Sequence, residues 1–380
     1  MKIAFICDLL GRENNGTTVT LYHLIDSLKE RGHSVYVVCP DESKKGEDGF
    51  FIAPTLKTNK IYAHIIKKTG AVIAGNCGSL LMSVIPAVDI VYIALPLPLG
   101  YGGAEIAAKF GKPIVASFHM QAENITAQLG FLKSRILSAR FYKVFYDRLY
   151  SHAAAVHYPT EFIKRFFEDR IKRKTPAFVI SNGVDDLFFA HRYDEYPRIS
   201  QKFTILSVGR LSAEKGRWQL IEAVARSKHK EDIKIVFAGD GQDENKLIRL
   251  AKCKKVDISV GFYPREELIA LQHGADIYVH TSLVETEGIA LTEAIVSGML
   301  PVVCRAKKSA ACTYAVNEAL IFNAGDVARL AKTIDALYED PSLIQKYKED
   351  YAKIVPSLSK KIYVDKMEAM FFDVLNNSKG

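Results

Sequence analysis

Long hydrophobic runs are absent from this sequence of 380 residues, and none approaches the ~20 apolar residues that a membrane-spanning helix needs. The first ten residues, MKIAFICDLL, include an acid at Asp8 and are predicted to form a strand and not a signal peptide. These features favour a cytoplasmic protein. Any contact with a membrane is expected to be peripheral, on the inner face of the cell membrane.

Motifs typical of several other protein classes are also missing. The six cysteines form no CxxC pair and no Cys/His cluster, so free thiols are favoured over a zinc site or disulfides. No GxGxxG follows the first predicted strand, which argues against a dinucleotide-dependent dehydrogenase.

Apolar runs and amphipathic segments alternate along the chain, which predicts an α/β fold. A chain of this length with 48% hydrophobic residues can bury two cores, so we expect two Rossmann-like domains, 1–190 and 191–356, with a polar linker near 190–202. Strands are predicted at 2–7, 34–39, 88–94, 113–117, 153–157 and 178–181 in the first domain, and at 203–208, 233–238, 258–262, 276–280 and 302–304 in the second.

Positive charge is concentrated in one segment. Residues 131–174 contain eleven lysines and arginines against four acids. The net charge of this segment, 11 − 4 = +7, is nearly the whole formal net charge of +8. Such a patch points to nucleic acid, anionic lipid or a phosphorylated substrate. Nucleic acid is disfavoured because no recognition motif accompanies the charge. The segment 131–150 is predicted to be a long helix, which either lies on anionic lipid or packs against the core with a solvated basic face. The candidate membrane-contacting cations are Lys133, Arg135, Arg140 and Lys143.

Two acids flank a predicted helix start in the stretch 281–301, TSLVETEGIALTEAIVSGMLP. Glu285 lies in the turn after a strand, the helix begins near Gly288, and Glu293 follows inside it. The N-terminus of a helix favours an anion, and ligands bind at the carboxyl edge of an α/β sheet. We therefore expect a phosphate to fit between these carboxylates. The alternative is a solvated loop acid and an ordinary surface helix acid.

Two basic residues bracket another turn at a strand end, in GRLSAEKG at 209–216. Arg210 offers a planar fork and Lys215 a point charge, and together they could neutralise a diphosphate. A salt-bridged surface turn is the alternative. Gly16 and Gly239 stand at further strand-to-helix turns, where a missing side chain lets a ligand approach the backbone.

In the first domain, His119 follows a strand and is therefore predicted to lie at the ligand edge of the sheet. A lone histidine of this kind is more often structural. The apolar segment 95–100, LPLPLG, is predicted to be a loop in which Leu97 and Leu99 line an acceptor site, or else a packed loop between domains.

The Glu-x7-Glu pair, the GR-L-x3-KG turn, the NGVD at 182–185 and the segment SFHMQAENIT at 117–126 together resemble the retaining glycosyltransferases of family 4. The last segment is similar to bacterial diacylglycerol- and sterol-glucosylating members. The resemblance implies a GT-B fold whose C-terminal helix, about 357–380, crosses back to the first domain. Two residues depart from the pattern: Glu287 replaces a Phe, and Ala122 replaces a Pro.

The resemblance also implies roles for individual residues. Glu293 would hold the ribose of a nucleotide sugar, with Gly288 and Ile289 at the helix start beside it. Glu285 would meet hydroxyls of the donor sugar, and His119 would contact the transferred sugar near the reaction centre.

The implied function is retaining transfer of a hexose from a nucleotide sugar, a UDP-sugar by preference, to a membrane lipid such as diacylglycerol or a sterol, forming an α-glycoside. No Asp-x-Asp occurs in the chain, so no metal cofactor is expected, and Arg210, Lys215 and the helix start would stabilise the leaving phosphate instead. A polysaccharide or soluble sugar acceptor is the first alternative. A non-catalytic nucleotide-sugar-binding protein is the second.

Overall fold

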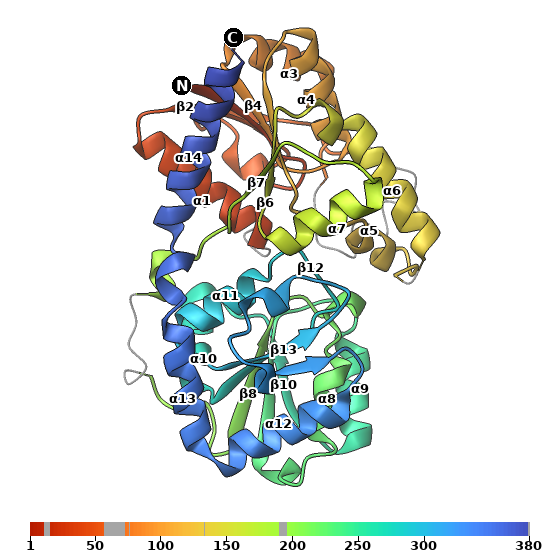
Figure 1. Cartoon of the computed structure of the whole chain (residues 1–380), viewed down its shortest axis with the longest axis vertical. Coiled ribbons are helices and arrows are strands. Elements are labelled where there is room, and N and C mark those ends of the chain that lie inside the picture. Colours follow the sequence, from red (N-terminus) through yellow and green to blue (C-terminus); the bar gives the residue numbers. More distant parts are fainter. Residues whose placement is uncertain (11–15, 57–72, 76, 133, 190–195, 379–380) are drawn as a thin grey trace. The chain divides into compact units, whose positions relative to one another are not determined.

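The protein folds into two compact units in the computed structural model, which describes residues 1–10, 16–56, 73–75, 77–132, 134–189 and 196–378 (Figure 1). The first domain comprises Met1–Asn182 together with Lys361–Gly380, and the second comprises Gly183–Lys360. The division therefore falls eight residues before the boundary expected at 190, and directly after Asn182 of the NGVD segment. The C-terminal residues Lys361–Gly380 belong to the first domain.

The first domain is built on seven parallel strands in the order β3-β2-β1-β4-β5-β6-β7. The strands are β1 (Lys2–Ile6), β2 (Ser34–Cys39), β3 (Phe50–Ile52), β4 (Ile90–Ile93), β5 (Ile114–Ser117), β6 (Ala155–Tyr158) and β7 (Ala177–Val179). The helices described are α1 (Gly16–Glu30), α3 (Gly78–Val84), α4 (Pro98–Lys109), α5 (Ala122–Gln128), α6 (Arg135–Arg148), α7 (Glu161–Ile171) and α14 (Lys360–Asn377). The strand order reverses between β1 and β4, and ligands of such sheets bind beyond the carboxyl ends of the strands at this point.

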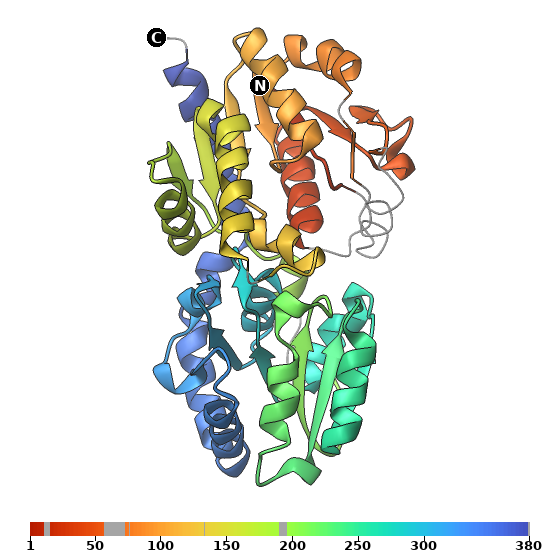
Figure 2. The same ribbon diagram turned by 90° about the vertical axis from the view of Figure 1, so that its right-hand side faces the viewer.

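The second domain repeats this plan with six parallel strands in the order β10-β9-β8-β11-β13-β15. They are β8 (Phe203–Val208), β9 (Ile233–Ala238), β10 (Asp257–Gly261), β11 (Ile277–His280), β13 (Pro301–Arg305) and β15 (Ile321–Asn323), and a small separate sheet pairs β12 (Val284–Glu285) with β14 (Lys308–Ser309). The helices are α8 (Trp218–Val224), α9 (Glu244–Lys254), α10 (Arg265–Gly274), α11 (Ile289–Val296), α12 (Val327–Glu339) and α13 (Pro341–Ala352), and they lie on both faces of the main sheet (Figure 2).

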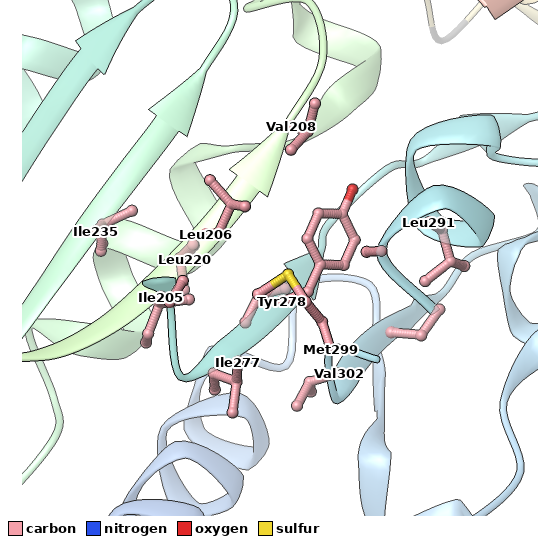
Figure 3. Packing of buried hydrophobic residues seen from close by; sticks show 14 of the residues in the cluster. Ile205, Leu206, Val208, Leu220, Ile235, Ile277, Tyr278, Leu291, Met299 and Val302 are labelled. Atoms are coloured by element: carbon pink, nitrogen blue, oxygen red, sulfur yellow. The ribbon is translucent and has the colours of Figure 1, made fainter. Parts of the chain in front are cut away.

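The core of the second domain explains why its strands read as continuous apolar runs. Strands β8 and β11 lie next to each other in register, with Ile277 beside Ile205 and Tyr278 beside Leu206. All four side chains are fully buried, and Figure 3 shows the Tyr278 ring beside Met299, on the side of Leu291 near the start of α11. A parallel sheet covered by helices on both faces buries both sides of its central strands, which favours β-branched and aromatic side chains there.

The segment 95–100 differs from the predicted loop, because α4 begins at Pro98. Proline fits the first position of a helix, and the carboxylate of Asp8 accepts hydrogen bonds from the backbone N–H groups of Leu99 (2.8 Å) and Gly100 (3.0 Å). Leu99 is fully buried in the domain core and packs there instead of lining an acceptor site, whereas Leu97 is half-buried.

None of the helices in the described part of the chain is both long enough and apolar enough to cross a membrane.

Candidate functional site

Glu285 and Lys215 meet at the carboxyl edge of the second sheet. The short strand β12 carries Glu285, and the Lys215 Nζ donates a hydrogen bond of 2.5 Å to Glu285 Oε1. The Nε2 of His280, at the end of β11, lies 3.3 Å from the same oxygen. Burial opposes ionisation of Glu285, but the charge of Lys215 and the contact with His280 outweigh it and hold the pKa of the carboxyl well below its usual range. Glu285 is therefore a buried carboxylate that stays ionised.

Helix α11 begins beside this pair. Gly288 precedes its first residue, Ile289, and adopts a φ of 103°, a left-handed conformation that favours glycine. The carbonyl of Gly288 accepts hydrogen bonds from Leu291 N–H (2.8 Å) and Thr292 N–H (3.1 Å). The N–H groups of the first helical residues have no partner inside the helix, so this end attracts an anion.

Glu293 lies further along α11 in a different environment. Burial raises the pKa of Glu293 to about 7; Arg265 opposes this shift and Asp185 adds to it. The Arg265 guanidinium lies 3.6 Å from the Asp185 carboxylate. Within the described residues, no hydrogen bond or ion pair holds the Glu293 carboxylate. Such a group suits a pair of ligand hydroxyls, because their hydrogen bonds would compensate a buried charge.

The two predicted phosphate-binding cations both face carboxylates. Lys215 is paired with Glu285, and an Arg210 terminal nitrogen lies 3.2 Å from Glu214 Oε1. Glu214 is fully buried, whereas Arg210 is 36% exposed. Each cation is thus fixed at the rim of the sheet by a carboxylate partner. A bound diphosphate would have to share each cation with that carboxylate.

Sequence reasoning missed two residues beneath this site, Arg217 and His280. Arg217 is buried and donates hydrogen bonds to the Ser207 hydroxyl and the Val208 carbonyl oxygen. Burial lowers the pKa of its guanidinium. Buried guanidinium groups are rare, and this one adds positive charge under Glu285. A signal for Arg217 was present, because this third basic residue directly follows the predicted turn at 209–216.

Glu287, the residue that departs from the family pattern, is buried. The Tyr314 hydroxyl donates a hydrogen bond of 2.6 Å to Glu287 Oε1, and the Ala310 N–H donates one of 3.0 Å to the Glu285 carbonyl oxygen. Together with the pairing of β12 and β14, these bonds connect the turn that carries Glu285 to residues 308–314.

Gly239 has a packing role that the sequence did not indicate. A Cβ on this residue, whose φ is 150°, would collide with the Gly209 carbonyl oxygen, and its N–H is already bound to the Gly261 carbonyl oxygen at 2.7 Å. Gly239 therefore lets two strand-to-helix turns approach closely. Gly16, the corresponding candidate in the first domain, is the first residue of α1.

We expect Gly239→Ala to destabilise the protein by about 2 kcal/mol more than Gly325→Ala, because the first variant adds a collision to the backbone strain that both share. Gly325 has a φ of 90°, and a Cβ added there would meet no atom within 4 Å, so it is the matched control. Urea unfolding measures the difference, and equal losses for the two variants would contradict the packing role.

His119 lies at the carboxyl end of β5 in the first domain, as predicted, and is 9% exposed. Burial, with a smaller contribution from His157, lowers the pKa of His119 to about 3. The imidazole is therefore neutral at physiological pH. Its Nε2 lies 3.2 Å from the hydroxyl oxygen of Tyr92.

Helix α6 presents the basic segment. Arg135, Arg140 and Lys143 are exposed on it, whereas Lys133 lies outside the described residues. Apolar side chains stand among these cations: Ile136 is 83% exposed and Val144 is 41% exposed. Tyr142 and Phe145 face the core, so α6 has both an anchored face and an exposed face of mixed apolar and basic character. Both alternatives for this helix predicted a basic exposed face.

The described ranges contain no group of three or more His, Cys, Asp or Glu side chains placed to hold a metal ion.

Two family profiles match the chain. Residues 14–186 match the profile described as glycosyltransferase family 4, and residues 193–354 match the one described as glycosyl transferases group 1. Together they span most of both domains.

The individual relatives share only a low sequence identity with this chain. The chain is 22% identical over 395 aligned residues to an alpha-monoglucosyldiacylglycerol synthase of Acholeplasma laidlawii, covering 96% of each chain. It is 25% identical to a GDP-mannose-dependent alpha-mannosyltransferase of Mycolicibacterium smegmatis, covering 79% of this chain and 78% of the relative. The solved structure of HepE from Anabaena with UDP and glucose has the same fold, with a TM-score of 0.76 at 16% identity over 98% of this chain and 99% of that one. The chain belongs to family 4 of the glycosyltransferases and has two Rossmann-like domains of GT-B type.

Proposed function

We propose that this glycosyltransferase moves a hexose from a nucleotide sugar, a UDP-sugar by preference, to a membrane lipid such as diacylglycerol or a sterol, with retention to give an α-glycoside. The observation that carries the donor half is the Lys215–Glu285 pair beside the start of α11. For the acceptor half, the support is the exposed apolar and basic face of α6, together with an end-to-end similarity to an alpha-monoglucosyldiacylglycerol synthase.

The donor chemistry follows from charge. When the glycosidic bond breaks, negative charge builds up on the leaving nucleoside diphosphate. Lys215, Arg210 and the N-terminus of α11 stabilise that charge without a metal ion. Glu285, kept ionised by its neighbours, accepts hydrogen bonds from hydroxyls of the transferred sugar, and Glu293 accepts those of the ribose. In front-face transfer the leaving phosphate takes the proton of the attacking acceptor hydroxyl.

The proposed acceptor requires the enzyme to reach a membrane surface. An anionic bilayer attracts Arg135, Arg140 and Lys143, each contributing about 1 kcal/mol near the surface. Insertion of Ile136 and Val144 adds the burial of apolar area. The protein then acts as a peripheral enzyme on the inner face of the cell membrane.

The test combines UDP- and GDP-hexoses with diacylglycerol, a sterol or ceramide in mixed anionic micelles, followed by extraction of the organic phase. We expect one donor to give a glycolipid with one lipid class, and the coupling constant of its anomeric proton to identify the α-linkage. A sugar product that stays in the aqueous phase with an oligosaccharide acceptor would favour the polysaccharide alternative instead. Absence of transfer to any acceptor, with nucleotide-sugar binding intact, would favour the non-catalytic alternative.

Replacing Ile136 by Glu is expected to weaken binding to anionic vesicles by about tenfold, because it removes an inserting side chain and adds a repelled charge. Co-flotation with vesicles of phosphatidylglycerol and phosphatidylcholine measures the effect. Ile248→Glu is the matched control, since Ile248 is 42% exposed on α9 of the second domain. Equal flotation of both variants, or no flotation of the unaltered protein at low salt, would contradict membrane docking by α6.

A further inference from the structure

A chain of hydrogen bonds runs through the interior of the first domain and ends on His119. It starts at the Ile180 carbonyl oxygen, which lies 2.7 Å from His157 Nε2. His157 Nδ1 lies 2.5 Å from the Ser117 hydroxyl, and the Tyr92 hydroxyl connects Ser117 (2.8 Å) to His119 Nε2 (3.2 Å). Tyr92, Ser117 and His157 are fully buried, so these bonds form away from solvent.

The direction of every bond follows from the first. A carbonyl oxygen only accepts, so His157 Nε2 must carry its proton. Burial lowers the pKa of His157 to about 4, so the ring is neutral and its Nδ1 is an acceptor. Ser117 therefore donates to His157, and Tyr92 donates its single hydroxyl proton to Ser117. The Tyr92 oxygen can then only accept, which requires a proton on His119 Nε2.

We propose that Tyr92, Ser117 and His157 are positioning residues that fix the tautomer of His119, with the proton on Nε2 and a lone pair on Nδ1. No hydrogen bond to Nδ1 is found within the described residues, so this atom is left for a ligand. The consequence is specific: His119 accepts a hydrogen bond from a hydroxyl of the bound sugar and does not donate one. This role of His119 deepens the proposed function and rests on it.

Packing keeps the chain of hydrogen bonds rigid. The Tyr92 ring lies 4.7 Å from Phe5 of β1 and 6.0 Å, edge on, from Phe371 of α14, measured between ring centroids. Tyr363 of α14 lies 6.1 Å from the His157 ring. The C-terminal helix thus packs against the rings of Tyr92 and His157, and a ring held this way has little freedom to turn and exchange its partners.

The tautomer can be read directly, without any turnover, from the two-bond 1H–15N correlations of protein labelled with 15N-histidine. The His119 signals are assigned by their loss in His119→Gln. We expect the pattern of a neutral ring protonated on Nε2 in the unaltered protein at pH 7. In Tyr92→Phe and Ser117→Ala we expect a mixture of tautomers. A ring protonated on Nδ1, or an imidazolium, in the unaltered protein would overturn the proposal.

The kinetic arm uses the donor and acceptor identified for the enzyme. We expect Tyr92→Phe to lower kcat by about tenfold with little change in the KM for the donor, since one neutral hydrogen bond is lost from a group at the reaction centre. Tyr158→Phe is the matched control, because it also removes the hydroxyl of a fully buried tyrosine. The Tyr158 hydroxyl lies 3.1 Å from Thr175 Oγ1 and takes no part in the hydrogen bonds that lead to His119. Thermal unfolding of both variants checks that each one folds.

The outcomes separate this inference from the proposed function. An unchanged tautomer and unchanged kcat in Tyr92→Phe would overturn the positioning role even if the enzyme is active. If the unaltered protein transfers no sugar, the proposed function fails, while the tautomer spectra still decide whether the buried chain controls His119.

Discussion

Lys215→Met is expected to lower kcat/KM by about a thousandfold, the largest effect predicted for a single substitution in this protein. The change removes the point charge that stabilises the leaving diphosphate, and it also leaves Glu285 buried without its closest counter-ion. The pKa of Glu285 should then rise, since burial, the strongest influence on this carboxyl, is no longer outweighed. Initial rates with the identified donor measure the loss.

The same substitution has a distinct signature in stability. In the unaltered protein the pKa of Glu285 is depressed, so its contribution to stability is present above the pKa of the unfolded state and is lost as the pH falls. In Lys215→Met we expect the free energy of unfolding to fall by about 3 kcal/mol at pH 7 and by less towards pH 4. Lys202→Met is the control, because Lys202 forms an exposed pair with Asp257 at 3.0 Å and should cost under ~1 kcal/mol. Equal effects of the two variants would contradict the role of Lys215.

Glu293→Gln is expected to make the protein more stable at pH 8 and to abolish tight donor binding. The folded-state pKa of Glu293 is raised to about 7, so the protonated form is favoured by folding. That contribution is fully present below the unfolded pKa, near 4.5, and is lost as the pH rises through about 7. A neutral amide avoids this loss. The free energy of unfolding of the variant should therefore exceed that of the unaltered protein by about 2–3 kcal/mol at pH 8 and by almost nothing at pH 4.

Urea unfolding between pH 4 and pH 8 tests this prediction, with Glu349→Gln on the exposed face of α13 as the control. A Glu293→Gln variant that is less stable than the unaltered protein at pH 8 would mean that the carboxylate is favourably paired in the free enzyme. The expected result identifies Glu293 as a residue that costs stability and is kept for ligand binding.

Much of the fold could be predicted from the sequence because the strands of parallel sheets are buried on both faces. Strands β2, β8 and β9 have the bounds that their apolar runs predicted. Strands β3, β12, β14 and β15 have only two or three residues each and leave no periodic signal. The start of α4 was missed because proline and leucine alternate there, and the capping carboxylate of Asp8 comes from the turn after β1, 91 residues from Leu99.

The sequence indicated some residues of the candidate site, but not how they pair. The spacing of Glu285 and Glu293 predicted one acid before a helix start and one inside the helix, and the structure has Glu285 on β12 and Glu293 within α11. That Lys215 binds Glu285, 70 residues away, depends on the order β8-β11 in the sheet. His280 carries no motif, Arg217 is indicated only by its place next to the turn at 209–216, and only the folded chain brings the two residues under the carboxylate.

Calorimetric titration of the full chain with UDP and with GDP tests the central claim most directly, because it needs no acceptor. The account predicts that one nucleoside diphosphate binds, that Lys215→Met weakens it at least tenfold, and that Lys202→Met leaves it unchanged. If neither nucleotide binds, or if Lys215→Met binds as tightly as the unaltered protein, then the edge of the second sheet formed by Lys215, Glu285 and the start of α11 is not the donor site.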